Sequence, residues 1–122
     1  MKFSEDFGNT RFRIRAYGPG WVRVNEQTLS RPFIISPEQL VTDWPPTGMD
    51  QLQPEHLEPL FDYGAEIILI GTGTRHLLPC PATYQALIRS GSGFELMETG
   101  AACRTLSVLL SENRRTIAAL FP

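Results

Sequence analysis

The sequence has little of several residue types on which common functions depend. Its 122 residues include two cysteines, two histidines and a single lysine, Lys2. Cys80 and Cys103 are too few and too far apart to form a metal site, and no Cys-x-x-Cys pair occurs. In a cytosolic protein both thiols are expected to be reduced and buried. We therefore expect no metal ion and no cofactor.

Long apolar runs and an excess of positive charge are also absent. No stretch approaches the roughly 20 apolar residues that span a bilayer, and the first residues, MKFSED, lack the apolar core of a signal peptide. We therefore expect a cytoplasmic protein without a transmembrane segment. The net charge of -2 argues against binding to nucleic acid, which requires a basic surface.

The length and the hydrophobic content of 42% fit one globular domain. Residues 1–10 carry no clear pattern and are predicted to form a flexible arm. Residues 11–122 are predicted to form a single domain, which is expected to be monomeric.

The first third of the chain predicts antiparallel strands. From Arg11 onward apolar and polar residues alternate, so that Ile14 and Ala16 face one side while Arg15 and Tyr17 face the other. Glycine and proline in Gly18-Pro19-Gly20 end this strand, and Asn25-Glu26 is a typical hairpin turn. Short strands are predicted over residues 11–17, 21–24, around Leu29, 33–35 and 40–44.

The remainder alternates helices with strands. Pro54 is predicted to begin a helix that buries Leu57, Leu60 and Phe61 and ends at Gly64. A strand over 67–70 is followed by a helix from Pro81 that buries Tyr84, Leu87 and Ile88, then by a strand over 94–97, a helix from Thr99 and a last strand over 116–121. Such alternation predicts parallel pairing. We expect an α/β (mixed α+β) domain with an antiparallel β-rich N-terminal part joined to a parallel βαβαβ unit.

A glycine loop, Gly71-Thr72-Gly73, follows the strand over 67–70, where a dinucleotide-binding fingerprint would start. The third glycine of that fingerprint is replaced by His76, and Leu77-Leu78-Pro79 cannot open a helix at once. A tight turn that lets backbones pack closely is therefore the favoured interpretation.

The ends of the two parallel strands form a better candidate site. Loops after such strands emerge at one edge of the sheet, where α/β proteins place ligands. The N–H groups that begin the helix at Thr99 would face an anion there, unless Thr99 simply caps that helix. The candidate ligand or anion site comprises Gly71, Thr72, Gly73, Arg75, Thr99, Gly100, Ala101 and Arg104.

Catalysis is less well supported. Cys103 on a first helical turn would have a lowered pKa and His76 could act as its base, but Cys103 also falls on the apolar stripe of its helix. A small core residue is the favoured interpretation, and Glu98 is expected to be a solvated carboxylate. No catalytic residue is predicted.

Arginines and aromatic residues gather on the polar side of the first two strands. Such residues become buried at binding hot spots between proteins, or they stack on single-stranded bases. A solvated sheet face with scattered charge is the alternative. The candidate partner surface comprises Arg13, Arg15, Tyr17, Trp21 and Arg23.

Three segments carry a resemblance to a known family: Tyr17–Asn25, Ile67–Gly73 and Glu95–Leu106. Together they resemble a small family of uncharacterised bacterial and archaeal proteins that includes mitochondrial complex I assembly factor three. The likeness extends over roughly residues 11–121 and implies a single α/β domain with a β-hammerhead-like N-terminal part. It also implies a binding or assembly role alongside partner assembly factors at the inner membrane, and it supplies no catalytic residue.

The leading hypothesis is therefore a non-enzymatic binding or assembly protein, with other proteins as partners, that assists a respiratory or membrane-associated complex. The alternative is a small-molecule or anion-binding protein, a class that includes enzymes, that uses the loops 71–75 and 99–104. Binding of single-stranded nucleic acid is a third, weaker hypothesis.

Overall fold

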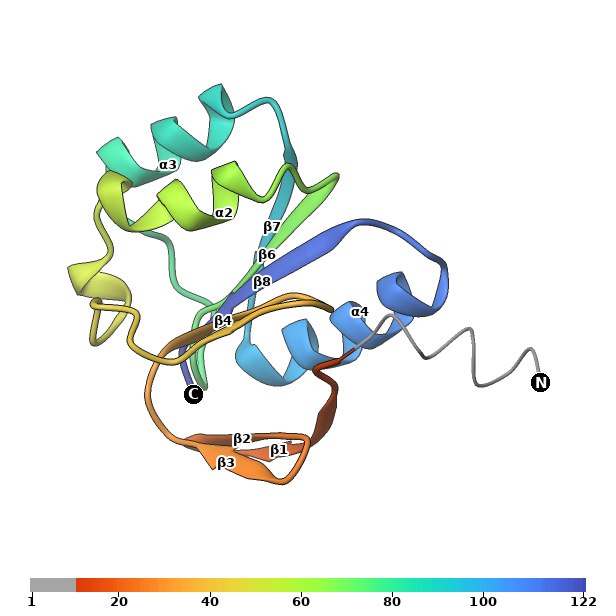
Figure 1. Ribbon diagram of the computed structural model, residues 1–122. Coiled ribbons are helices and arrows are strands. Elements are labelled where there is room, and N and C mark those ends of the chain that lie inside the picture. The colour runs from red at the N-terminus through yellow and green to blue at the C-terminus, as the bar shows by residue number, and fades with distance from the viewer. Residues whose placement is uncertain (1–10) are drawn as a thin grey trace.

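A computed structural model describes residues 11–122, and the predicted arm, residues 1–10, lies outside the described residues (Figure 1). The chain forms two sheets, with helices on both faces of the larger one. The strands are β1 (Ile14–Gly18), β2 (Trp21–Val24), β3 (Gln27–Leu29), β4 (Phe33–Ile35), β5 (Leu40–Val41), β6 (Ile67–Gly71), β7 (Gly93–Met97) and β8 (Thr116–Leu120). The helices are the 3₁₀ helices η1 (Met49–Gln51) and η2 (Pro54–Leu57) and the α-helices α2 (Glu58–Asp62), α3 (Pro81–Arg89) and α4 (Thr99–Ser111).

The larger sheet has five strands in the order β5-β4-β8-β6-β7. Strand β6 pairs in parallel with both β7 and β8, which confirms the predicted βαβαβ unit. Strand β4 pairs antiparallel with β8, so part of the N-terminal region extends the parallel sheet and makes it mixed. The other sheet consists of three antiparallel strands in the order β1-β2-β3. The turn between β2 and β3 contains Asn25, whose φ is 53°.

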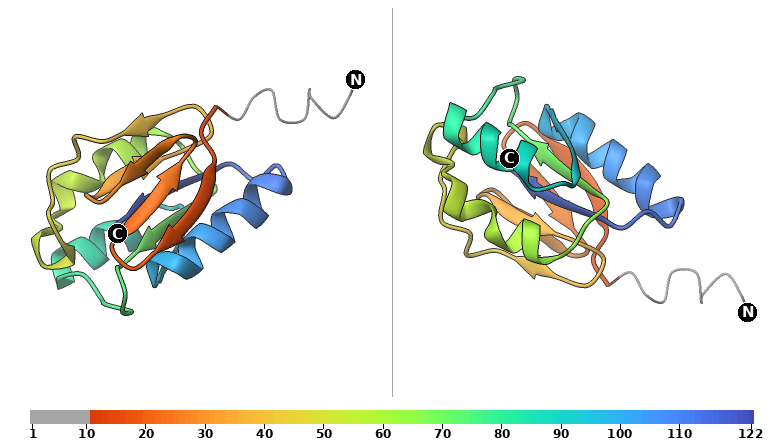
Figure 2. Two further views of the ribbon diagram at one scale, coloured as in Figure 1. Left: turned by 90° about the horizontal axis from the view of Figure 1, so that it is seen from below. Right: turned by 90° about the horizontal axis from the view of Figure 1, so that it is seen from above.

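Helices cover both faces of the five-stranded sheet (Figures 1 and 2). Helices α2 and α3 lie on one face, and α4 lies on the other. Ile68 and Ile70 of β6 pack with Leu57, Leu60 and Leu87 beneath α2 and α3. Leu69, which faces the other way, packs in a second cluster whose members from α4, β2 and β4 are Ala102, Cys103, Leu106, Val22, Val24, Phe33 and Ile35. The β1-β2-β3 sheet and α4 thus share one face of the large sheet. The prediction of a strand buried on both faces is confirmed.

A β-bulge in β1 changes which residues face the core. The register places Ile14 opposite Val24, but Ala16 opposite Arg23 and Tyr17 opposite Val22. Directly opposed residues of an antiparallel pair share a face, so Tyr17 lies on the inner side with the fully buried Val22. The predicted alternation is therefore wrong after Ile14, since the bulge moves Ala16 to the outer side.

The helices mostly follow the predictions. Leu57 and Leu60 are fully buried, and Gly64, Gly91 and Asn113 end their helices with positive φ, as expected for left-handed C-terminal residues. The segment from Pro54 begins as the 3₁₀ helix η2 before it continues as α2.

The prediction that α3 buries Tyr84 and Ile88 is wrong, because both are exposed, at 39% and 52%. Thr83 and Leu87 are the buried residues of this helix. The predicted strand over 40–44 is shorter than expected, since β5 ends at Val41 and Trp44 lies beyond it.

No helix within residues 11–122 combines the length and the apolar character needed to cross a membrane.

Candidate functional site

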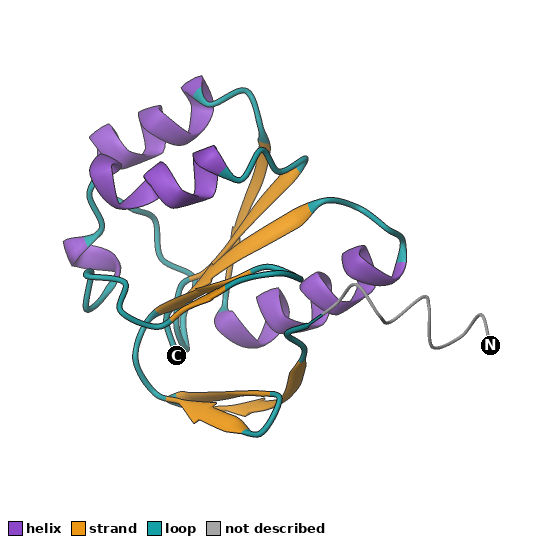
Figure 3. Cartoon of the chain, viewed as in Figure 1, coloured by secondary structure: helices purple, strands orange, loops and turns teal. Residues whose placement is uncertain are grey.

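The carboxyl ends of β6 and β7 meet at one edge of the sheet, as the sequence predicted. The chain leaves β6 as a loop toward α3, whereas it leaves β7 directly into α4 on the opposite face (Figure 3). Thr99 N–H donates to Gly73 O at 2.9 Å, and Thr72 N–H donates to Met97 O at 2.8 Å. The two predicted segments, 71–75 and 99–104, are therefore in direct contact.

Thr99 connects three segments at this edge. Its hydroxyl accepts a hydrogen bond from Gly73 N–H at 2.8 Å and donates one to Phe121 O at 2.7 Å. The N-cap of α4 is Glu98, whose side chain makes no capping hydrogen bond. The expectation that Thr99 caps the helix is therefore wrong, because its hydroxyl instead joins the glycine loop to the end of β8.

The glycine loop is closed by its own hydrogen bonds. The Thr72 hydroxyl donates to Arg75 O and accepts from Leu77 N–H at 3.1 Å. A Cβ on Gly71 would lie 2.8 Å from Leu120 Cδ2 and 3.0 Å from Thr99 Cα, so no side chain fits there. This close approach agrees with the interpretation of the loop as a tight turn, and it leaves no space for a side chain at Gly71.

Tyr17 covers the start of α4. Arg104 Nη1 donates to Tyr17 Oη at 2.6 Å, and a Cβ on Gly100 would lie 3.0 Å from the Tyr17 ring. This contact follows from the bulge, which places Tyr17 on the inner side of the small sheet. Arg75 and Arg104 remain exposed, while Gly100 and Ala101 are half-buried. Ligand binding by these eight residues stays a prediction.

The Tyr17–Arg104 contact gives a first testable prediction. Tyr17→Phe removes the hydroxyl that accepts the guanidinium hydrogen bond but keeps the ring. Because both side chains are exposed, we expect the free energy of unfolding to fall by only about 0.5 kcal/mol, measured by urea denaturation. Tyr84→Phe is the matched control, since the hydroxyl of Tyr84 has no hydrogen-bond partner within residues 11–122. Equal effects of the two substitutions would contradict a stabilising role for this contact.

The residues of the predicted partner surface lie on two sides of the small sheet. Trp21 and Arg23 lie on the outer side, and Arg15 at the bulge is exposed. Tyr17 instead faces α4, and Arg13 is half-buried, with its backbone N–H bonded to Asn25 Oδ1 at 3.0 Å. The structure therefore places Trp21 and Arg23 on one side and separates Tyr17 from them, while exposed Arg15 directly precedes Ala16, which lies opposite Arg23. We call Arg15, Trp21 and Arg23 the Trp21 face.

The two cysteines lie in different environments. Cys103 is 1% exposed in the core, and burial raises the pKa of its thiol to about 11, although neighbouring Arg104 acts in the opposite direction. The interpretation as a core residue is confirmed, and a reactive thiolate is not expected there. The expectation that Cys80 is buried is wrong: it is the exposed N-cap of α3, where the Thr83 hydroxyl and nearby backbone groups lower the pKa of its thiol.

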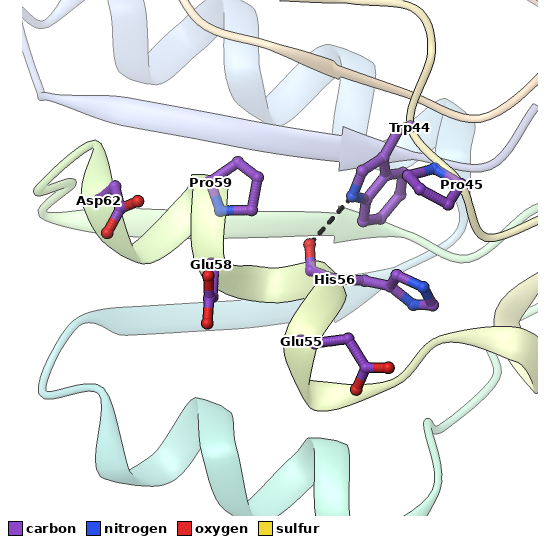
Figure 4. A pocket seen from close by; sticks show the side chains of 7 residues that line it. All are labelled: Trp44, Pro45, Glu55, His56, Glu58, Pro59 and Asp62. Carbon is purple, nitrogen blue, oxygen red and sulfur yellow. Dashed lines mark hydrogen bonds between the residues drawn. The ribbon is translucent and has the colours of Figure 1, made fainter.

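A pocket of about 500 Å³ lies elsewhere, between Trp44 and α2 on the other face of the large sheet (Figure 4). Trp44 is buried, with its indole N–H bonded to His56 O at 2.9 Å and its ring 5.3 Å from that of Phe121. The remaining lining residues are Pro45, Glu55, Glu58, Pro59 and Asp62.

This pocket was missed from the sequence, although Glu55, Glu58 and Asp62 have the spacing of one helical face. Their carboxylates follow one another along the helix and do not converge on a point (Figure 4). Across residues 11–122 no three His, Cys, Asp or Glu side chains are grouped closely enough to hold a metal ion.

Residues 14–121 match a family described as "Protein of unknown function (DUF498/DUF598)". The chain belongs to this family. The match covers every strand and helix described above, including both strand-end loops and the Trp21 face. The resemblance inferred from the glycine segments and the strand–helix unit is thereby confirmed.

Two curated relatives of this chain carry different names. The "13 kDa major membrane protein" of Francisella tularensis is 29% identical over 102 residues, which cover 83% of each chain. The "NADH dehydrogenase [ubiquinone] 1 alpha subcomplex assembly factor 3" of Danio rerio is 28% identical over 111 residues. That match covers 89% of this chain but only 63% of the zebrafish protein.

The fold of this DUF498-family chain is similar to that of a solved structure. A Xanthomonas campestris protein determined by NMR is 38% identical, with a TM-score of 0.83 over 90% of this chain and 83% of that one. The mixed α/β fold with its two sheets is therefore a property that this chain shares with its relatives.

Proposed function

We propose that this DUF498-family chain is a non-catalytic protein-binding protein that assists the assembly of a respiratory or other membrane-associated complex. The name of the zebrafish relative, an assembly factor of NADH dehydrogenase, supports this role most directly. We also propose that the chain is a cytoplasmic monomer when it is not bound to its partner. Sedimentation velocity of the purified protein tests the last point, and a stable dimer would contradict it.

The Trp21 face is the surface that we propose for partner binding, and its geometry carries the proposal. A Cβ on Gly18 would lie 2.6 Å from Trp21 Nε1, so the indole ring lies directly over the backbone of β1. Trp21 is half-buried, and exposed Arg23 follows it on the same side of β2. Tryptophan and arginine are the residues most enriched at binding hot spots, and a ring held in one orientation loses little conformational freedom on binding.

The strand ends, in contrast, are closed by internal bonds. The Thr72 and Thr99 hydroxyls and the Gly73 N–H, which would otherwise contact a ligand, are engaged in hydrogen bonds with the protein itself. This favours a binding protein over an enzyme that uses this edge. A role for Gly71, Thr72, Gly73, Arg75, Thr99, Gly100, Ala101 and Arg104 in binding a small anion is the alternative, and Arg75 and Arg104 are its exposed cations.

Affinity capture from an extract of the native cell tests the proposed function. We expect the wild-type chain to enrich a subunit or assembly protein of a membrane-associated complex, and Trp21→Ala to reduce that enrichment at least about tenfold, as for a hot-spot tryptophan. Ile88→Ala is the matched control, because it removes an exposed apolar side chain from α3 on the other face of the large sheet. Equal capture by the wild type and Trp21→Ala, or no enriched partner, would contradict the proposal.

Thermal-shift measurements with phosphate, nucleotides and small carboxylates test the alternative. A ligand that binds only the folded state must raise the melting temperature of the protein. A shift that Arg104→Ala abolishes would favour the anion site over the Trp21 face.

A further inference from the structure

The charged residues of this chain are strongly segregated along its sequence. Residues 11–31 contain five arginines and one acidic residue, Glu26. Residues 32–74 contain no lysine or arginine, and their acidic residues are Glu38, Asp43, Asp50, Glu55, Glu58, Asp62 and Glu66. The net charge of -2 therefore conceals two segments of opposite sign.

The fold separates the arginines of β1 and β2 from the two acidic residues of α2, Glu58 and Asp62. The small sheet lies on one face of the five-stranded sheet, and α2 lies on the other (Figures 1 and 2). Within residues 11–122 neither Arg15 nor Arg23 forms an ion pair with a carboxylate, and the Arg23 guanidinium donates only to Asn25 O, at 3.2 Å. The Trp21 face thus carries exposed positive charge beside an aromatic ring.

We propose that the Trp21 face binds an acidic segment of the partner protein. This inference rests on the proposed function and adds the chemistry of the partner. Carboxylates of the segment would pair with Arg15 and Arg23, since guanidinium groups bind carboxylates in a planar, bidentate manner. An apolar side chain of the segment would lie on the Trp21 ring, next to the small outer-side residues Ala16 and Gly18.

A nucleic acid fits this face less well than an acidic protein segment does. Single strands are bound by successive aromatic rings that stack on successive bases. The bulge turns Tyr17 toward α4, so the outer side of β1 and β2 presents Trp21 as its only aromatic side chain. The carboxylates of the opposite side would also repel a long polyanion.

Residue-resolved NMR titration of the full chain tests the inference. The probe is a short capped peptide in which glutamate alternates with leucine. The same peptide with lysine in place of glutamate and an oligothymidylate of equal charge serve as comparison probes. We expect the glutamate peptide to shift the Trp21 indole and the amides of β1 and β2 saturably. The lysine peptide is expected to shift the amides of η2 and α2 instead.

Two charge reversals sharpen this experiment. Each exposed ion pair contributes only a modest free energy, so Arg23→Glu is expected to raise the Kd of the glutamate peptide roughly three- to tenfold. Arg89→Glu on α3 is the matched control, because it makes the same change in net charge at an exposed site away from the small sheet. The amide spectrum of each variant shows directly whether it is folded.

Several outcomes would overturn the inference. These are the absence of saturable shifts with the glutamate peptide, shifts centred on Arg75 and Arg104, equal weakening by the two charge reversals, or tighter binding of the oligothymidylate to the Trp21 face. In each of these cases, a partner whose capture requires Trp21 would still support the proposed function. If the glutamate peptide still binds the Trp21 face but no partner is captured through Trp21, the proposed assembly role alone is contradicted.

Discussion

Thr99→Val is expected to lower the free energy of unfolding by about 2 to 4 kcal/mol, although valine has nearly the same shape as threonine. The hydroxyl of Thr99, a residue that is 6% exposed, serves the half-buried Gly73 N–H and the buried Phe121 O. Its removal leaves Gly73 N–H without its acceptor and Phe121 O without its donor. The loss costs about 1 to 3 kcal/mol for the buried Phe121 O and about 1 kcal/mol for the half-buried Gly73 N–H.

Urea denaturation of Thr99→Val and Thr99→Ser separates the hydroxyl from the methyl group. Thr99→Ser keeps both hydrogen bonds and loses one methyl group, so we expect it to cost only about 1 kcal/mol. If Thr99→Val is as stable as the wild type, the hydroxyl does not hold the strand ends together. The closed geometry that disfavours a ligand at this edge would then lose its main support.

The parallel half of the fold was predictable because its signals are local. The apolar run from Ile67 to Ile70 is buried on both faces, as such runs are in parallel sheets. Turn residues such as Asn25 and Asn113 adopt the positive φ that their side chains tolerate. Contact between the loops 71–75 and 99–104 also followed, because parallel strands end at a common edge.

The bulge in β1 could not be predicted from alternation alone. Just before the bulge, the side chain of Asn25 bonds to the backbone of Arg11 and Arg13 across the hairpin. Such contacts join residues that only the folded chain brings together. Their consequence is large for the candidate site, since the bulge sends Tyr17 to Arg104 and leaves Trp21 with Arg23.

The faces of α3 were misassigned for a related reason. An apolar side chain is buried only where another element covers it, and α3 lies over the end of the sheet at β7, an edge strand. Leu87 reaches the core there, while Ile88 does not. Thr83 is buried instead, because its hydroxyl finds an acceptor at Leu52 O, 2.9 Å away.

Gly71→Ala is the second substitution with a large expected effect, about 2 to 3 kcal/mol of lost stability. The new Cβ would lie 2.9 Å from Thr99 Oγ1 and 3.0 Å from the Thr99 backbone, which cannot move without breaking the bonds to Gly73 and Phe121. Gly48→Ala is the control, because its Cβ would meet only the mobile end of Asp50, at 3.0 Å. Urea denaturation of both variants is the measurement, and similar small losses would contradict the close packing of β6 against α4. A large loss at Gly71 alone would show that glycine is required there for packing, which explains the glycine loop without any bound nucleotide.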